Sequence, residues 1–476
     1  MTAETVPCRI FLLRHGQAQM PDEQGRIWSY SEAGLTAAGR QRATELAKVL
    51  EPVHLDVVYT SDLRRARETA AAIAAPRRIP LVADARLREV DIGDFEGMTL
   101  ERLRQVDPRY LPWPEVYFEG RHAGPNRHVP ADLPWPGGES VAGALERVLP
   151  VFLDIVRRHQ GETVALCSHA YVLQALLCHI VGADVSRYWA FSGRHASLTL
   201  AEVGPDGRGL LRTVNGDLGL AELVGGRLPF RRREAPPDPD PDLNATCRVF
   251  LARHGQSMVV EGGEPVYSHN PIGLTGEGRL QAQRLAAALA PVRLDAVYTS
   301  NLNRAGETAR FVADAQGLEP IVLPELIEIS LGDFEGMTLD RVHAEHEPFI
   351  PWLEVAFNER FPSEKFHHPA DLVFPNGESV IGVYQRVIDP FLRIVRAHLG
   401  GTVAVISHGW VLQPLLCHVL GAPITSYFRL QLRYAEYSLV EIDADGLGVL
   451  EVLSAGSRVQ QAGGPGPLAE TRGGSG

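Results

Sequence analysis

The sequence predicts an α/β protein of two tandem three-layer α/β/α domains, each with a mostly parallel sheet. Apolar runs of strand length alternate with segments of helical periodicity, which is typical of parallel α/β units. One series of motifs also occurs twice in the 476-residue chain at a constant offset, as in His15 and His254 (254 − 15 = 239). Between the copies, residues 225–242 are rich in Pro and charge and have no apolar periodicity, which indicates a linker.

The repeat extends along almost the whole of each copy. The stretches 59–69, 93–100, 136–141 and 167–170 return at 298–308, 332–339, 375–380 and 406–409. A period this long is no solenoid repeat, and each copy is large enough to bury its own core. We therefore predict domains at 1–224 and 246–460, a linker at 225–245 and a disordered tail at 461–476.

The first half of the first copy begins with a strand. Residues 8–13 are an apolar run that stops at the R-H-G turn. Residues 37–50 have apolar side chains at helical spacing and predict a helix, and residues 55–59 predict a second strand. Ser61 or Asp62 then serves as the N-cap of a helix that contains R-R-A-R-E-T.

The second half of the copy continues the alternation. G-E-S at 138–140 opens a helix that runs to Val156, residues 163–167 form a third strand, and a further helix follows His169. Arg14-His15, Arg65 and His169 each come just after the carboxyl end of a predicted strand. Ligands bind at that edge of open α/β sheets, so we expect these side chains to converge there.

Composition and charge narrow the class of ligand. The 46 Lys and Arg face 58 Asp and Glu, for a net charge of −12, which argues against a general nucleic-acid binder. A small anionic substrate needs only a few arginines and fits this balance. The five cysteines have no C-x-x-C spacing, so we expect neither a disulfide framework nor a zinc site.

The longest apolar stretch, residues 163–181, resembles a membrane span in length. It contains Ser168, His169, Gln174 and His179, so a buried strand followed by a buried helix is the better interpretation. The N-terminus has no basic region followed by an apolar core, as a signal peptide has. We expect a cytoplasmic protein that binds no membrane, and the sequence leaves its oligomeric state open.

Two histidines, two arginines and a carboxylic acid at one edge favour phosphoryl transfer. A neutral imidazole can attack phosphorus and form a phosphohistidine. Arginine forks bind phosphate oxygens and stabilise the charge of the transferring group. A carboxylic acid can protonate the leaving oxygen and later deprotonate the attacking water.

These motifs resemble those of the histidine phosphatase superfamily, the phosphoglycerate mutase-like proteins. The R-H-G turn stands in register with Y-T-S-x-L-x-R-A-x-E-T, L-x-E-x-x-x-G-x-F-E-G, G-E-S and S-H-[AG], over about residues 8–215 and 247–455. The resemblance implies a phosphoglycerate mutase-like fold in each copy. It also implies a metal-independent phosphomonoesterase with a phosphohistidine intermediate, no cofactor and a small phosphorylated substrate.

The resemblance assigns roles residue by residue. It makes His15 the nucleophile, Glu89 the proton donor, and Arg14, Arg65 and His169 the phosphate ligands of the first copy. The matching residues of the second copy are His254, Glu328, Arg253, Arg304 and His408.

The register of the two copies decides between neighbouring candidates. Arg64 is a rival of Arg65, but its partner is Asn303, whereas Arg65 matches Arg304. Asp91 is a rival of Glu89, but its partner is Ser330.

Both copies depart from the family at one position. Family members often have R-H-G-[EQ]-[ST]-x-x-N, but Pro21 and Val260 stand where the asparagine is usual. That asparagine is a phosphate ligand in the family, so its absence counts against a mutase and against the usual substrates.

Residues that select the substrate are expected in the segments 108–132 and 348–371, which would cover the two sites. The candidates are Gln17, Gln256, Arg121, Arg360, His128 and His367. Three functions stay open: a phosphatase with two active sites, a phosphomutase of the phosphoglycerate mutase type, and a protein in which one or both copies serve binding or regulation.

Overall fold

A computed structural model describes most of both copies. The described residues are 6–19, 26–103, 105–106, 108–110, 128–216, 246–257, 265–345, 347–349 and 369–455. The predicted linker and tail lie outside them, so the predicted domain limits stay predictions.

Six strands form the sheet of the first copy, in the order β3-β2-β4-β1-β5-β6. They are β1 (Cys8–Arg14), β2 (Val57–Thr60), β3 (Leu81–Ala83), β4 (Thr163–Ser168), β5 (Leu198–Val203) and β6 (Gly209–Val214). Strands β1 to β4 run parallel to one another. Strand β5 pairs antiparallel with β1, and β6 pairs antiparallel with β5. The sheet is therefore mostly parallel, as predicted.

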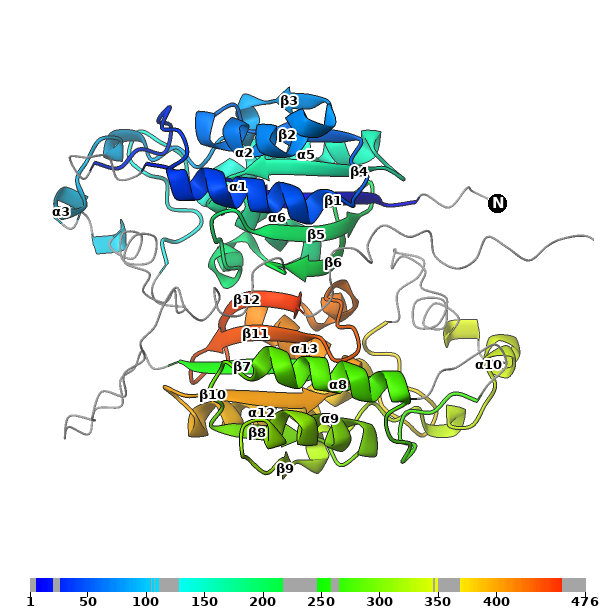
Figure 1. The fold of residues 1–476 in the computed structure, drawn as a ribbon. Coiled ribbons are helices and arrows are strands. Elements are labelled where there is room, and N and C mark those ends of the chain that lie inside the picture. The colour runs from blue at the N-terminus through cyan, green and yellow to red at the C-terminus, as the bar shows by residue number, and fades with distance from the viewer. Residues whose placement is uncertain are drawn as a thin grey trace, which may run out of the picture.

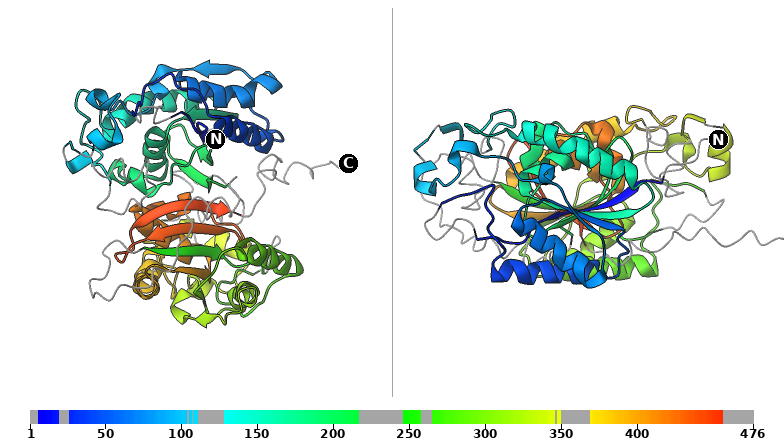
Figure 2. Two further views of the ribbon diagram at one scale, coloured as in Figure 1. Left: turned by 60° about the vertical axis from the view of Figure 1, so that its left-hand side comes forward. Right: turned by 90° about the horizontal axis from the view of Figure 1, so that it is seen from above.

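Helices cover both faces of this sheet (Figure 1; Figure 2). The longer ones are α1 (Ala37–Leu50), α2 (Arg64–Ala74), α5 (Val141–Arg158) and α6 (Ala170–Val181), and α3 (Leu100–Leu103) is one short turn. Strand side chains alternate between faces. Phe11 and Leu13 accordingly pack with α1 and α2, whereas Ile10 and Leu12 pack with α5 and α6. The result is the predicted three-layer α/β/α arrangement.

The second copy repeats this architecture. Its strands are β7 (Cys247–Arg253), β8 (Ala296–Thr299), β9 (Ile321–Val322), β10 (Thr402–Ser407), β11 (Tyr437–Ile442) and β12 (Gly448–Ala455). Its helices are α8 (Gly276–Leu289), α9 (Asn303–Asp314), α10 (Leu339–Glu345), α12 (Val380–Ala397) and α13 (Gly409–Leu420). The strand order β12-β11-β7-β10-β8-β9 is the counterpart of the order in the first copy.

The two sheets join edge to edge into one twelve-stranded sheet. Strands β6 and β12 pair antiparallel through Val214 and Leu453, and they lie next to each other in the middle of Figure 1. Phe191 bridges to Leu450, and Leu211 bridges to Leu430. Position 191 corresponds to 430 and 211 to 450 under the offset, so these contacts have the reciprocity of a two-fold interface. The sequence patterns do not predict this contact.

Helix caps show one success and one error. Helix α5 begins directly after G-E-S, as predicted, and Ser140 is its N-cap, which accepts a hydrogen bond from the Gly143 N–H at 3.0 Å. Helix α2 instead begins after Leu63, which makes no side-chain cap. The prediction of Ser61 or Asp62 was wrong because other partners occupy both side chains: His169 binds the Ser61 hydroxyl and Arg88 binds the Asp62 carboxylate.

Among the described residues, no helix combines the length and apolarity that crossing a bilayer requires.

Candidate active site

The predicted residues of the first copy meet at the carboxyl edge of the sheet. His15 follows β1, His169 follows the neighbouring strand β4, and Arg65 lies in the first turn of α2, just beyond β2. The ring centroids of His15 and His169 are 5.0 Å apart. Parallel pairing of these strands thus brings together residues that are about 50 to 150 positions apart in the chain.

The tautomer of His15 follows from its contacts. Its Nδ1 lies 2.7 Å from the carbonyl oxygen of Gly16, which can only accept, so Nδ1 carries the hydrogen. The Nε2 atom then keeps its lone pair and accepts from Nε of Arg65 at 3.3 Å. Burial and, after it, the charge of Arg65 lower the pKa of His15 well below its usual value. His15 is therefore a neutral imidazole with a lone pair that faces a guanidinium.

The two arginines are buried and held by backbone carbonyls. Arg65 donates to Ser29 O at 2.6 Å and to Ser31 O at 3.2 Å. Arg14 donates to Gly193 O, and its Nη2 lies 3.1 Å from His195 Nε2. Fixed guanidinium groups beside a neutral imidazole form an arrangement suited to an anion.

His169 adds a second neutral ring to the cluster. Its Nε2 lies 2.9 Å from the Ser61 hydroxyl, and its Nδ1 has no partner among the described residues. Burial lowers the pKa of His169 well below the usual value, and the charges of Arg65 and Arg14 act in the same direction. A buried ring nitrogen without a partner can bind a substrate oxygen.

Glu89 has the environment of a protonated acid. It is buried, its Oε1 accepts from the Val90 N–H at 3.0 Å, and its Oε2 has no partner within the part of the chain that the structure describes. Burial raises the pKa of Glu89, while Arg14 and Arg65 act against this rise. The free oxygen can donate a proton to a leaving group.

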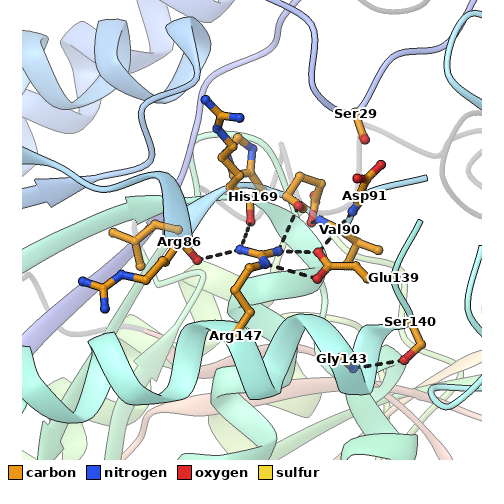
Figure 3. A network of polar contacts seen from close by, with 12 residues as sticks. Ser29, Arg86, Val90, Asp91, Glu139, Ser140, Gly143, Arg147 and His169 are labelled. Carbon is orange, nitrogen blue, oxygen red and sulfur yellow. Dashed lines mark hydrogen bonds and ion pairs between the residues drawn. The ribbon is translucent and has the colours of Figure 1, made fainter. Parts of the chain in front are cut away.

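An ion pair supports the backbone of Glu89. Arg147 on α5 donates to Glu89 O at 3.1 Å and Arg88 O at 3.1 Å, and it pairs with the carboxylate of Glu139 (Figure 3). Arg386 pairs with Glu378 at 2.8 Å and fills the same place in the second copy. The sequence analysis placed G-E-S at the start of a helix but did not identify this supporting pair.

The second copy contains the same cluster. His254 Nδ1 lies 2.7 Å from Gly255 O, and Arg304 Nε donates to His254 Nε2 at 3.2 Å. The ring centroids of His254 and His408 are 5.0 Å apart. Burial raises the pKa of Glu328, as it does for Glu89. The two sites share this arrangement, but Arg253 and Glu328 are less buried than Arg14 and Glu89.

The surroundings of His15 and His254 differ in two aromatic positions. His195 lies 5.5 Å from His15 between ring centroids, and its counterpart Tyr434 lies 5.6 Å from His254. Tyr30 in the first copy corresponds to His269 in the second. The offset pairs a histidine with a tyrosine at both positions, in opposite order, and this exchange was a signal that the sequence analysis missed.

Tyr434 and His269 make contacts of their own in the second site. The Arg253 guanidinium lies 4.0 Å from the centroid of the Tyr434 ring, and His269 Nε2 lies 2.8 Å from Glu328 O. A phenol ring therefore covers Arg253 in the second copy, whereas Arg14 contacts an imidazole in the first.

The rival candidates have other partners. Arg64 is exposed and pairs with Glu68 at 2.6 Å. The Asp91 carboxylate accepts from the Gly93 N–H at 2.8 Å and shapes a turn.

The candidate substrate-selecting residues are only partly described. The Gln17 side chain accepts from Thr36 at 3.1 Å, and that of Gln256 accepts from Thr275 at 2.9 Å. The ring of His128 stacks on Trp189 at 4.8 Å. Arg121, Arg360 and His367 lie outside the described residues, so their predicted roles stay predictions.

In the ranges that the structure covers, no group of three or more His, Cys, Asp or Glu side chains has a geometry that could hold a metal ion.

Comparison with known proteins gives a consistent family. The model of the histidine phosphatase superfamily (branch 1) matches residues 10–216 and 249–454. Phosphoserine phosphatase 1 of Hydrogenobacter thermophilus is 29% identical over 193 residues, which are 40% of this chain and 85% of that protein. The probable phosphoglycerate mutase GpmB of Salmonella choleraesuis is 29% identical over 174 residues, 37% of this chain and 75% of that protein. Among solved structures, Bacillus stearothermophilus YhfR is 32% identical, with a TM-score of 0.38, and the match covers 44% of this chain and 98% of that chain.

Proposed function

The chain belongs to the histidine phosphatase superfamily and is a phosphoric monoester hydrolase, and from this premise we propose that it has two phosphohistidine-forming sites, at His15 and His254. Both act on small phosphorylated metabolites without a metal ion. The matching of both copies to one family model supports this, as do the phosphatases among the relatives.

The first half-reaction transfers phosphoryl to the enzyme. The Nε2 lone pair of His15 attacks phosphorus in line with the ester oxygen, the P–O bond breaks, and Glu89 gives its proton to the leaving alkoxide. The guanidinium groups of Arg14 and Arg65 neutralise the charge on the phosphoryl oxygens. The products are an alcohol, a phosphohistidine and a Glu89 carboxylate.

The second half-reaction restores the enzyme. Water attacks phosphorus and the P–N bond breaks, while the Glu89 carboxylate takes the proton of the water. Inorganic phosphate leaves, and His15 returns to its neutral tautomer with Nδ1–H bound to Gly16 O. Glu328 and His254 perform the same steps in the second copy.

One observation carries the proposal: each copy has a neutral histidine whose Nε2 accepts from a buried arginine, and the same arginine acts on a glutamate whose pKa burial raises. The exchanged residues around the nucleophiles support different substrates for the two sites. The substrate of each site is a small phosphorylated metabolite.

The test is phosphate release from a panel of sugar, polyol, nucleotide and carboxylic-acid phosphates with EDTA present. The wild type, His15→Ala, His254→Ala and the double variant are compared on every substrate. We expect each single variant to lose a different part of the activity by about a thousandfold or more, because the nucleophile is removed, and the double variant to lose all of it.

Other outcomes would replace the proposal. If one single variant abolishes every activity, the other copy serves binding or support. If an isomerised phosphoester appears in place of phosphate, the enzyme is a mutase. If the wild type releases no phosphate from any substrate, the phosphatase proposal fails.

A further inference from the structure

We propose that Glu451, on β12 of the second copy, is a positioning residue for the phosphate site of the first copy. It acts through Arg194, which lies in the loop between the 3-10 helix Val185–Ala190 and β5. The inference rests on the proposed function of that site. It makes the first active site dependent on the second copy.

The loop around Arg194 contacts the nucleophile turn directly. Gly193 O accepts from the Arg14 guanidinium, and His195 Nε2 lies 3.1 Å from Arg14 Nη2. The N–H of Ala196 donates to His15 O at 3.1 Å. The position of this loop therefore sets the position of a phosphate-binding arginine.

The second copy holds this loop in place. Nε and Nη2 of Arg194 lie 3.1 and 2.8 Å from one carboxylate oxygen of Glu451. The Glu451 side chain is only 7% exposed, so this pair is screened less than a surface pair. Asn215 adds a second attachment, since its amide donates to Glu451 O at 2.7 Å and to Ser192 O at 3.3 Å.

The opposite half of the interface cannot repeat the ion pair. Under the offset of 239, Arg194 corresponds to Arg433 and Glu451 corresponds to Arg212. Two guanidinium groups repel each other, and Arg212 instead pairs with Glu202 of its own copy at 2.7 Å.

The loop of the second site has an attachment within its own copy. Asn215 corresponds to Ser454, whose hydroxyl donates to Glu436, a residue of the same loop. The backbone of Glu436 accepts from the Arg253 N–H at 3.2 Å. The backbone contacts are reciprocal, since the Ser192 N–H donates to Leu450 O and the Gln431 N–H donates to Leu211 O, both at 3.1 Å. The ion pair has no such reciprocal, so we expect only this side-chain support to pass from the second copy to the first.

The decisive variant is Glu451→Gln, which keeps the size of the side chain and removes its charge. Misplacement of a catalytic group by about 1 Å can cost about a hundredfold in rate. Gln can still accept one hydrogen bond, so we expect a loss of about tenfold in kcat at the first site. We also expect inorganic phosphate to inhibit that site about tenfold more weakly, because Arg14 binds it less well.

The two sites serve as controls for each other. The first site is measured alone in the His254→Ala chain, and the second alone in the His15→Ala chain. Glu451→Gln should lower activity in the former and leave it within about twofold in the latter. Arg212→Gln is the matched control, because it stands at the position that corresponds to Glu451 and removes an ion pair within the first copy that does not involve Arg194, and it should change neither site.

Reversal of the pair separates positioning from general damage. Arg194→Glu alone should lower first-site activity, and Arg194→Glu with Glu451→Arg should restore it to within about threefold of the wild type, since it rebuilds the pair. Equal losses at both sites, or no loss at the first, would overturn the proposal. So would a double reversal no better than Arg194→Glu alone in a chain whose unfolding midpoint matches the wild type.

Failure of the proposed function gives a different result. If the wild type hydrolyses no phosphoester, calorimetric titration with inorganic phosphate replaces the assay. Glu451→Gln should then weaken one of two phosphate-binding events and leave the other unchanged. Two unchanged events would overturn the positioning role, whatever the reaction.

Discussion

At the residue scale, the pKa values of His15 and Glu89 shift in opposite directions, and the two shifts suit different roles in one reaction. Burial lowers the pKa of the His15 imidazole and raises the pKa of the Glu89 carboxyl, because it disfavours the charged form of each side chain. A nucleophile needs its lone pair and an acid needs its proton, so one environment prepares both. Arg14 and Arg65 oppose the rise at Glu89, and a bound phosphate would offset their charge.

Glu89→Gln tests the role of this acid through the leaving group. In the His254→Ala chain, we expect the variant to lose about a hundredfold or more in kcat on alkyl phosphates, whose alkoxide needs a proton. With p-nitrophenyl phosphate the leaving group needs none, so the loss in phosphohistidine formation should be much smaller. Pre-steady-state release of p-nitrophenol measures that step. Equal losses on both substrates would remove Glu89 from the role of proton donor.

The buried histidines make stability depend on pH. The folded pKa of His169 lies well below the value of 6.5 for an exposed imidazole, so the unfolded chain binds more protons below about pH 6.5. The stability that the neutral His169 ring contributes is fully present above that pH. It is lost as the pH falls toward the pKa of His169 in the folded protein. Each such histidine contributes up to about 1.4 kcal/mol per pH unit to the slope.

His169→Asn should therefore reduce the slope of the free energy of unfolding between about pH 6.5 and 5 by about 1 kcal/mol per pH unit. Urea titrations at several pH values measure it. A slope equal to that of the wild type in His169→Asn would mean that its ring is charged in the folded protein.

At the element scale, α1 packs unusually close to the nucleophile turn. A Cβ added to Gly39, in the first turn of α1, would lie 2.0 Å from Gln17 O. The site of the second copy has the same contact, between Gly278 and Gln256 O at 1.9 Å. The absence of a side chain at this position lets the helix begin directly beside the R-H-G turn.

Gly39→Ala should push α1 away from the turn. We expect a loss of about 1–3 kcal/mol in stability from overpacking, and a fall in first-site kcat of about tenfold or more. Gly306→Ala on α9 is the control, because nothing lies within 4 Å of its added Cβ and alanine favours a helix by about 1 kcal/mol. Thermal unfolding and the His254→Ala assay measure both effects, and an active, stable Gly39→Ala would refute the close contact.

Sequence patterns predicted the elements with strong periodicity and missed those whose burial depends on partners. The strand 8–13, the helix 37–50 and the cap at Ser140 follow from local signals. Strands β5 and β6 were not predicted, because their side chains are buried without a regular alternation. Part of their cover comes from the second copy, which no local window contains.

The site shows the same division. The motifs predict His15, Arg65 and Glu89 as site residues, because an identical residue stands at the corresponding position of the second copy. His195 corresponds to a tyrosine in the second copy, so identity between the copies does not single it out, although its ring lies beside that of His15. The structure was needed to place it there.

At the scale of the whole molecule, the seam between the copies belongs to the core. One cluster of buried apolar side chains extends from Phe191 and Val214 across to Leu430 and Leu453. Among the described strands, pairing of β6 with β12 leaves the short strands β3 and β9 at the sheet edges. Short edge strands reduce the risk of pairing with other chains.

We expect the two copies to unfold as one cooperative unit. Phe250→Leu, in the core of the second copy, should cost about 1–2 kcal/mol and shift a single calorimetric transition without splitting it. First-site activity after brief heating should decline in parallel. Two separate transitions, or a second-copy transition that shifts alone, would show that the seam does not couple the copies.

The two-fold seam also has a consequence for stoichiometry. Two separate chains related by such an interface dissociate on dilution, once their concentration falls below the dissociation constant. Here the covalent connection holds one first copy against one second copy at any concentration. It also excludes the self-pair of first copies, in which Arg194 would meet Arg212 on both sides. Two separate copies could form three dimers: first with first, second with second, and first with second. Their fusion in one chain favours the pair of first with second.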